Sequence, residues 1–219
     1  MNVLILGATG MLGQGVLREC LLDDGVKRVV TLGRTPTGQA HPKLLEIVHG
    51  DLLHLEPVED RLRDLDACFY CLGASAAGSS EAEYSKINYE ITLAVAETLV
   101  RLDPDITFVY VSGTGTDSTE RGRVMWARVK GRTENALLRL HFRAAYMLRP
   151  GVIIPMYGAR SKTRLYRVFY TVLGPLLPAV KALFPRSVIT TEHLGRVMLR
   201  LARSGYSKHV LEMADLASL

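Results

Sequence analysis

Three glycines near the start of the chain are spaced for binding a phosphate group. Gly7, Gly10 and Gly13 follow an apolar run over residues 3–6 and precede apolar residues at helical spacing. This pattern predicts a buried parallel strand that turns into a helix, whose first N–H groups and dipole favour an anion. Such a turn without any ligand is the alternative. The position between a strand and a helix favours the pyrophosphate of a dinucleotide, because glycines there permit the tight turn and the close packing.

A basic residue follows the second predicted strand, where two forms of a dinucleotide can be distinguished. An Asp or Glu at this position would bind the adenosine ribose hydroxyls and select NAD. This chain has Arg34 instead, and a guanidinium can hold the 2′-phosphate of NADP. A solvated surface arginine is the alternative. We therefore expect NADP (as NADPH) to be preferred, with NAD as the second candidate.

Turns after the third and fourth predicted strands complete this expected site. Asp51 could meet the adenine amino group through its carboxylate, or the backbone N–H of Leu52 could do so. An ordinary turn aspartate is the alternative. Small residues over 73–78 follow the strand expected at residues 67–72, and they would let the middle of the cofactor lie across the strand ends.

Composition and cysteine spacing argue against several other classes of function. Cys68 and Cys71 form a C-x-x-C pair, but residues three apart on a strand face opposite sides, and no second Cys/His pair completes a zinc site. We therefore expect no metal. The net charge of +5 suits phosphate-bearing ligands and is too small to indicate nucleic acid. Three cysteines are typical of a reducing compartment, so a cytoplasmic protein is expected. No signal peptide or integral membrane segment is expected either.

Alternating strand and helix patterns indicate the fold that positions these residues. They predict a doubly wound parallel α/β sheet of Rossmann type over residues 1–155. Strands are expected over residues 3–6, 26–32, 44–49, 67–72, 105–111 and 144–149, and helices over 11–22, 58–65, 81–102 and 125–140. Asn88 lies beside the apolar stripe of the third helix. A buried Asn needs partners, so it could bridge helix to sheet or support a catalytic lysine through a water.

The character of the chain changes after residue 155. Four basic residues between 160 and 167 precede an apolar stretch that ends at Phe184 and is interrupted by glycine and prolines. We interpret residues 156–190 as a small helical substrate lobe or lid. A peripheral membrane or dimer contact made by residues 160–184 is the alternative.

The last part of the chain, residues 191–219, is expected to pack back on the core. A short strand over 187–190 leads to Thr190 or Thr191, either of which could cap a helix over residues 192–202. A final strand is expected over residues 209–213.

Together these patterns resemble the short-chain dehydrogenase/reductase superfamily, in its extended or atypical branch. The chain is most similar to the NADP-binding Tat-interacting-protein type and to epimerases, over nearly its whole length. The marks that carry the resemblance are the three glycines, Gly33-Arg34, Asp51, Cys71-Leu72-Gly73, Asn88, Val111-Ser112-Gly113, Lys130 and Leu148-Arg149-Pro150-Gly151. The resemblance implies that the cofactor is bound by Gly7, Ala8, Thr9, Gly10, Met11, Leu12, Gly13, Arg34, Asp51, Leu52, Cys71, Leu72, Gly73, Lys130, Pro150, Gly151 and Ile153.

The resemblance also implies a catalytic Ser, Tyr and Lys that reduce or oxidise a carbon–oxygen bond. In the family the Tyr donates a proton to the substrate oxygen, the Lys lowers the pKa of that Tyr and holds the nicotinamide ribose, and the Ser polarises the carbonyl. Ser112 and Lys130 match, but Trp126 occupies the position four residues before Lys130. An indole N–H does not ionise near neutral pH, so it cannot act as the general acid. Tyr157 or Tyr84 could supply the proton instead, with a purely structural tyrosine as the alternative.

Three functions fit these residues. The first is an NADP-dependent reductase of a small carbonyl or sugar-like substrate with altered acid chemistry. The second, which Trp126 favours, is a non-catalytic NADP-binding redox sensor or scaffold. The third is a membrane-surface protein and rests on residues 160–184 alone.

Two further expectations concern contacts of the chain. Glu134 is expected to be a helix-surface partner of Lys130 or of an arginine. The protein is also expected to form a homodimer.

Overall fold

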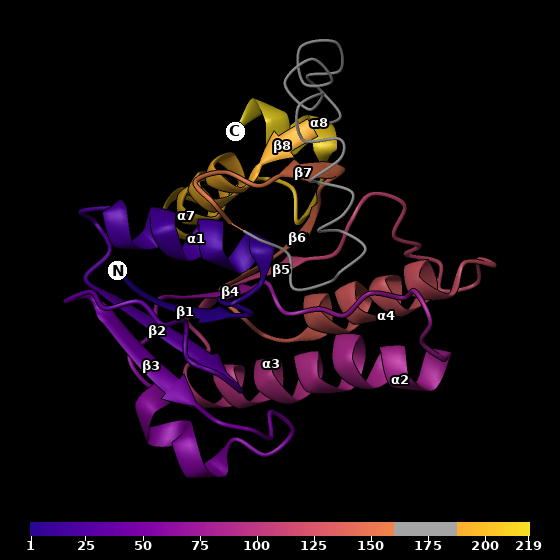
Figure 1. The fold of residues 1–219 in the computed structure, drawn as a ribbon. Coiled ribbons are helices and arrows are strands. Elements are labelled where there is room, and N and C mark those ends of the chain that lie inside the picture. Colours follow the sequence, from indigo (N-terminus) through magenta and orange to yellow (C-terminus); the bar gives the residue numbers. More distant parts are fainter. Residues whose placement is uncertain (160–187) are drawn as a thin grey trace.

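A seven-stranded parallel sheet forms the centre of the computed structural model, which describes residues 1–159 and 188–219 (Figure 1). The strand order is β3-β2-β1-β4-β5-β6-β9, so the order reverses at β1, between β2 and β4. The strands are β1 (Asn2–Leu6), β2 (Arg28–Gly33), β3 (Leu44–Val48), β4 (Ala67–Tyr70), β5 (Thr107–Val111), β6 (Ala144–Arg149) and β9 (Val210–Glu212). This arrangement confirms the predicted doubly wound sheet, and each strand end lies within two residues of its expected position.

The central strands are apolar because helices cover both of their faces. Residues 3–6 of β1 are fully buried, and Ile5 pairs with Thr31 of β2 on one side and Phe69 of β4 on the other. A parallel strand buried on both faces reads as a continuous apolar run rather than an alternating one. That run is why the sequence alone indicated the strand.

Two layers of helices enclose the sheet (Figure 1). Helices α1 (Met11–Leu22) and α7 (Thr191–Ser204) cover one face, over a core cluster that includes Val16 and Leu194. The other face carries α2 (Glu81–Ser85), the π-helical turn η2 (Lys86–Glu90), α3 (Ile91–Leu102) and α4 (Met125–Arg139). The helix expected over 81–102 is therefore continuous but widened by a π-helical turn. The expected helix over 58–65 is the 3-10 helix η1 (Glu56–Leu62).

The C-terminal part of the chain adds one helix to the layer that contains α1 and one strand to the sheet. The Thr190 hydroxyl accepts a hydrogen bond from the N–H of His193 and so caps α7. Glu19 of α1 and Arg196 of α7 form an ion pair between the two helices. Strand β9 adds to the sheet beside β6, and the short helix α8 (Met213–Ser218) follows it.

The small second sheet contains the short strand expected over 187–190, but sequence patterns did not indicate its partner strand. It pairs β7 (Val152–Ile154) with β8 (Val188–Thr190) in parallel. The expected lid over residues 156–190 lies largely outside the described residues, as do the basic residues between 160 and 167 and the apolar stretch that follows them. Among the described helices, none combines the length and apolar character needed to cross a bilayer.

Candidate functional site

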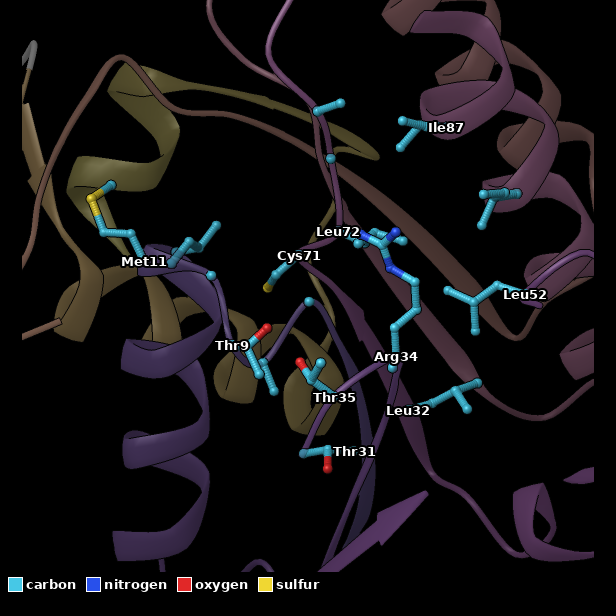
Figure 2. A pocket seen from close by; sticks show the side chains of 18 of the residues that line it. Thr9, Met11, Thr31, Leu32, Arg34, Thr35, Leu52, Cys71, Leu72 and Ile87 are labelled. Carbon is cyan, nitrogen blue, oxygen red and sulfur yellow. The ribbon is translucent and has the colours of Figure 1, made fainter. Parts of the chain in front are cut away.

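A cavity of about 1170 Å³ lies at the carboxyl ends of β1, β2 and β4 (Figure 2). Its walls come from the turn after β1, the segments after β2, β3 and β4, and from Ile87 and Ile91 of the helix beyond. This is the crevice at which the strand order reverses, where open α/β sheets bind ligands. Its volume exceeds the roughly 300–1,000 Å³ typical of small-molecule sites, so an extended ligand fits.

The first turn lies against the backbone of the neighbouring strand. Gly7 has a φ of 76°, and a Cβ built on it would lie 2.7 Å from the carbonyl group of Cys71. A Cβ on Gly13 would lie 2.1 Å from the carbonyl oxygen of Gly7. Both positions therefore require glycine, as expected for a turn that brings its backbone close to a bound phosphate.

The start of α1 offers uncapped backbone donors beside the cavity. Gly10 is the N-cap residue, no side chain caps the helix, and its first turn carries no acidic residue. Met11 and Leu12 of that first turn line the cavity. Free N–H groups and the positive end of the helix dipole together suit a pyrophosphate. The residues present therefore fit a dinucleotide.

The Arg34 side chain extends into the cavity from the end of β2. Figure 2 shows it pointing toward Leu72 and Ile87, with Leu52 on one side of it and Thr35 on the other. Arg34 is exposed and forms no hydrogen bond or ion pair with any residue that the structure describes. Its guanidinium is therefore available to an anionic ligand.

Asp51 lines the cavity, but its carboxylate already has partners. It accepts hydrogen bonds from the N–H of Leu53 at 3.0 Å and from the ring of His54 at 2.9 Å. The hydrogen bond from His54 is the main reason why the pKa of Asp51 lies below its usual value. The neighbouring Leu52 is buried and supplies an apolar wall.

Most residues expected to bind the cofactor do line this cavity. They are Gly7, Ala8, Thr9, Gly10, Met11, Leu12, Arg34, Asp51, Leu52, Cys71, Leu72, Gly73, Gly151 and Ile153. Gly13 packs beneath the turn, and Pro150 is buried, with its carbonyl accepting the N–H of Thr114. Ala74 and Ser75, of the small residues expected along the middle of the cofactor, line the cavity as well. The lining residues that sequence reasoning missed are Thr31, Leu32, Gly33, Thr35, Thr37, Gly50, Leu53, Lys86, Ile87, Ile91 and Val152. The spacing of four between Ile87 and Ile91 is a signal that could have indicated a shared wall.

Lys130 lies directly behind one wall of the cavity. Its Nζ donates a hydrogen bond to the Val111 carbonyl at 3.3 Å and lies 4.7 Å from the centre of the Tyr110 ring. A Cβ built on the lining residue Gly73 would be 3.6 Å from the same Nζ. Burial lowers the pKa of Lys130 to about 8, although the charge of Glu134 acts in the opposite direction.

The hydroxyl of Ser112 is held within a buried polar network. It lies 2.5 Å from Oε1 of Glu134 and 3.0 Å from the carbonyl oxygen of Leu148. Arg149 contacts both carboxylate oxygens of Glu134, at 3.1 and 2.5 Å, and also pairs with Glu212 at 2.9 Å. The single hydroxyl proton of Ser112 therefore already has two acceptors within the protein.

The expectation that Glu134 lies on the helix surface is wrong. Glu134 is 1% exposed, because the face of α4 that carries it packs toward the sheet. A buried carboxylate requires a partner, and Arg149 of β6 provides a bidentate one. The expected arginine partner is thus present, in the core rather than at the surface.

Trp126 lies one helical turn before Lys130 and is partly buried. The edge of its ring packs against Gly115, where a built Cβ would lie 3.5 Å from the ring. Its indole N–H makes no hydrogen bond within residues 1–159 and 188–219, and Trp126 is not among the described residues that line the cavity.

The two tyrosines considered as substitute acids have other surroundings. The Tyr157 hydroxyl donates to Glu192 of α7 at 3.1 Å, and the Arg18 guanidinium lies 3.6 Å from the centre of its ring. Tyr84 is buried, and its carbonyl accepts the side-chain N–H of Asn88. Asn88 also accepts a hydrogen bond from the Ala74 N–H at 3.4 Å, so it links the helix to the segment after β4.

The cysteines take no part in a metal centre in the described chain. Cys20, Cys68 and Cys71 are all free thiols. Cys71 lines the cavity, and burial raises its pKa to about 12. Across the described ranges, no three His, Cys, Asp or Glu side chains are grouped so that they could hold a metal ion.

Comparison with known proteins assigns the N-terminal part of the chain to a family. The pattern of the NAD dependent epimerase/dehydratase family matches residues 3–120, which contain the glycine turn, Arg34 and Ser112. The chain belongs to this family. The superfamily that the sequence motifs indicated is thereby confirmed.

Sequence similarity to individual relatives extends over most of the chain. Protein FMP52, mitochondrial, of Debaryomyces hansenii is 25% identical over 92% of this chain and 88% of the relative. Protein fmp52-2, mitochondrial, of Aspergillus terreus is 27% identical over 98% and 95%. The names of these relatives contradict the expectation of a cytoplasmic protein. Unpaired cysteines indicate a reducing environment, and they do not distinguish one reducing compartment from another.

Solved structures share the fold at low sequence identity. The Bordetella bronchiseptica enzyme WbmF in complex with NAD+ has a TM-score of 0.71 and 17% identity, over 99% of this chain and 76% of that one. An oxidoreductase of the short chain dehydrogenase/reductase family from Burkholderia thailandensis has a TM-score of 0.71 and 16% identity, over 100% and 93%. These similarities confirm the Rossmann-type fold.

Proposed function

We propose that this family member binds NADP in the described cavity and reduces the carbonyl group of a small or sugar-like substrate. The observation that carries the proposal is the Arg34 guanidinium, which extends into the cavity without a partner among the described residues. An arginine at the end of β2 can bind a 2′-phosphate, and it cannot bind ribose hydroxyls as an acidic residue does. The WbmF complex with NAD+ and UDP and the MoeE5 complex with UDP-glucose and NAD support a dinucleotide and a sugar-like substrate.

Different groups of the chain bind different parts of this cofactor. The uncapped first turn of α1 binds the pyrophosphate, and Arg34 binds the 2′-phosphate. Asp51 or the N–H of Leu52 meets the adenine, and Lys130 holds the nicotinamide ribose from behind Gly73. When bound, the nicotinamide supplies the hydride for the reduction.

Proton delivery to the substrate must differ from that of the family's tyrosine enzymes. Trp126 occupies the position of the acid and cannot ionise near neutral pH. We assign proton donation to Lys130 rather than Tyr157, because the Tyr157 hydroxyl is bonded to Glu192, whereas the Lys130 ammonium lies directly behind the Gly73 wall of the cavity and has a pKa of about 8. Ser112 would orient the substrate oxygen, in competition with its bond to Glu134.

A non-catalytic NADP-binding sensor or scaffold is the second candidate function. Two features favour it: Trp126, which the family resemblance aligns with the acid, and a Ser112 hydroxyl whose proton already has acceptors in Glu134 and Leu148. Both features weaken turnover and leave the cofactor cavity intact.

Turnover distinguishes the two candidates. Purified protein with saturating NADPH is mixed with a panel of aldehydes, ketones and nucleotide sugars, and NADPH oxidation is followed by absorbance. The reductase proposal expects oxidation with at least one carbonyl, with Lys130→Met losing about 10²–10⁴-fold in kcat as expected for removal of a general acid. Saturable NADPH binding without oxidation across the panel would contradict the reductase and support the sensor.

A further inference from the structure

A second cationic side chain, that of Lys86, lines the same cavity from the helix beyond β4. Lys86 is the first residue of the π-helical turn η2, and its side chain is exposed. It forms no hydrogen bond or ion pair with any of the residues placed in the structure. The proposed function so far gives this ammonium group no role.

The π-helical turn fixes where Lys86 stands. The N–H of Ile91 bonds to the carbonyl of Lys86 across the widened turn. Within the turn Asn88 is fully buried and bonded to the segment after β4, while Lys86 and Ile87 line the cavity together with Ile91, the first residue of α3. The backbone of Lys86 is therefore anchored, and only its flexible stem moves. Such π-helical turns frequently occur at functional sites.

Charge in the cavity favours a polyanionic ligand between its walls. Arg34 points toward Ile87, the residue next to Lys86 (Figure 2). Asp51 is the one carboxylate among the described lining residues, and it is already bonded to His54. Two cations that face one cavity repel each other without a ligand, and an anion placed between them removes that repulsion.

The order of the strands indicates which part of a dinucleotide each cation meets. Arg34 follows β2, the glycine turn follows β1, and Lys86 lies beyond the segment that follows β4. The backbones of Arg34 and Lys86 thus lie on opposite sides of β1, the strand that leads into the glycine turn. A 2′-phosphate belongs on the β2 side, whereas Lys86 faces the part of the cofactor that lies across β1 and β4.

We propose that Lys86 binds the pyrophosphate of the dinucleotide, a group that NADH and NADPH share. Arg34 and Lys86 then divide recognition: Arg34 selects the form with a 2′-phosphate, and Lys86 strengthens the binding of both forms equally. This inference rests on the proposed function, because it requires a dinucleotide in the cavity.

Calorimetric titration of the full chain with NADPH and with NADH tests this division. Lys86→Met keeps the length and apolar character of the stem and removes only the charge. We expect the Kd values for both cofactors to rise by a similar factor, about 5- to 20-fold, as for loss of a partly exposed charge-assisted contact. Lys86→Arg should restore most of the affinity. Lys27→Met is the matched control, because Lys27 is exposed and does not line the cavity.

Each other outcome overturns the inference in a distinguishable way. Unchanged affinity of Lys86→Met for both cofactors would show that Lys86 binds no phosphate, while leaving the proposed function intact. A loss confined to NADPH would place Lys86 at the 2′-phosphate instead of the pyrophosphate. A wild-type chain that binds neither cofactor would overturn the proposed function and this inference together.

Discussion

At the scale of single residues, Glu134 and Arg149 connect the candidate catalytic serine to the core. Arg149 holds both oxygens of Glu134, and one of these oxygens also accepts the hydroxyl proton of Ser112. Glu212 of the last strand completes the pair from the other side. The position of Ser112 is thus set by residues far from it in sequence.

Glu134→Gln is expected to destabilise the fold substantially. The change leaves the buried Arg149 with Glu212 as its remaining carboxylate, and removing one partner of a buried ion pair typically costs about 3–5 kcal/mol. Urea denaturation should give a loss at the lower end of this range, because Glu212 still compensates part of the charge. The control is Glu97→Gln, an exposed glutamate on α3. A loss below about 0.5 kcal/mol for Glu134→Gln would contradict the buried pair.

The stability contribution of Lys130 is expected to depend on pH with a definite sign. Its folded pKa of about 8 lies below the ordinary lysine pKa of 10.5. Between these values the unfolded state binds more protons than the folded state, so the free energy of unfolding rises with pH in this window. Relative to Lys130→Met, the wild type should gain about 2 kcal/mol between pH 7 and pH 9.5 in urea denaturation. A constant difference between the two proteins would show that Lys130 titrates at its ordinary pKa.

At the scale of elements, the sequence predicted those strands and helices whose signals are local. Residues 3–6 of β1, 67–70 of β4 and 108–111 of β5 form unbroken apolar runs because both faces of the sheet are covered, and the helix over 81–102 has a regular stripe. The π-helical turn η2 could not be predicted, because its insertion leaves the apolar spacing of Ile87 and Ile91 unchanged. Strand β7 is too short to show a periodic pattern.

The glycine turn offers a prediction at the same scale. Gly13→Ala should destabilise the fold by about 1–3 kcal/mol and weaken dinucleotide binding, because the new Cβ would collide with the carbonyl oxygen of Gly7. Gly50→Ala is the matched control: Gly50 also lines the cavity, but a Cβ there meets nothing within 4 Å. Thermal unfolding and NADPH titration of both variants measure the difference. Equal behaviour of the two variants would contradict the close approach of the turn to the helix.

At the scale of the whole molecule, the sheet brings together residues that belong to separate motifs in the sequence. The sequence predicted most of the cavity wall, because the ends of parallel strands meet at one edge and each end carried a recognisable turn. It did not predict the inward position of Glu134, whose partners lie 15 residues away in Arg149 and, through Arg149, in Glu212 at the far end of the chain. Pairings over such sequence distances leave no local pattern.

The central claim, an NADP site defined by Arg34, is tested most directly by comparing two affinities. Calorimetry of the wild type should show NADPH binding about 10- to 100-fold more tightly than NADH, as expected for a charge-assisted bidentate contact with the 2′-phosphate. In Arg34→Ala this ratio should fall close to one, while Arg63→Ala, an exposed arginine that does not line the cavity, keeps it. Equal affinities of the wild type for NADPH and NADH would contradict the claim.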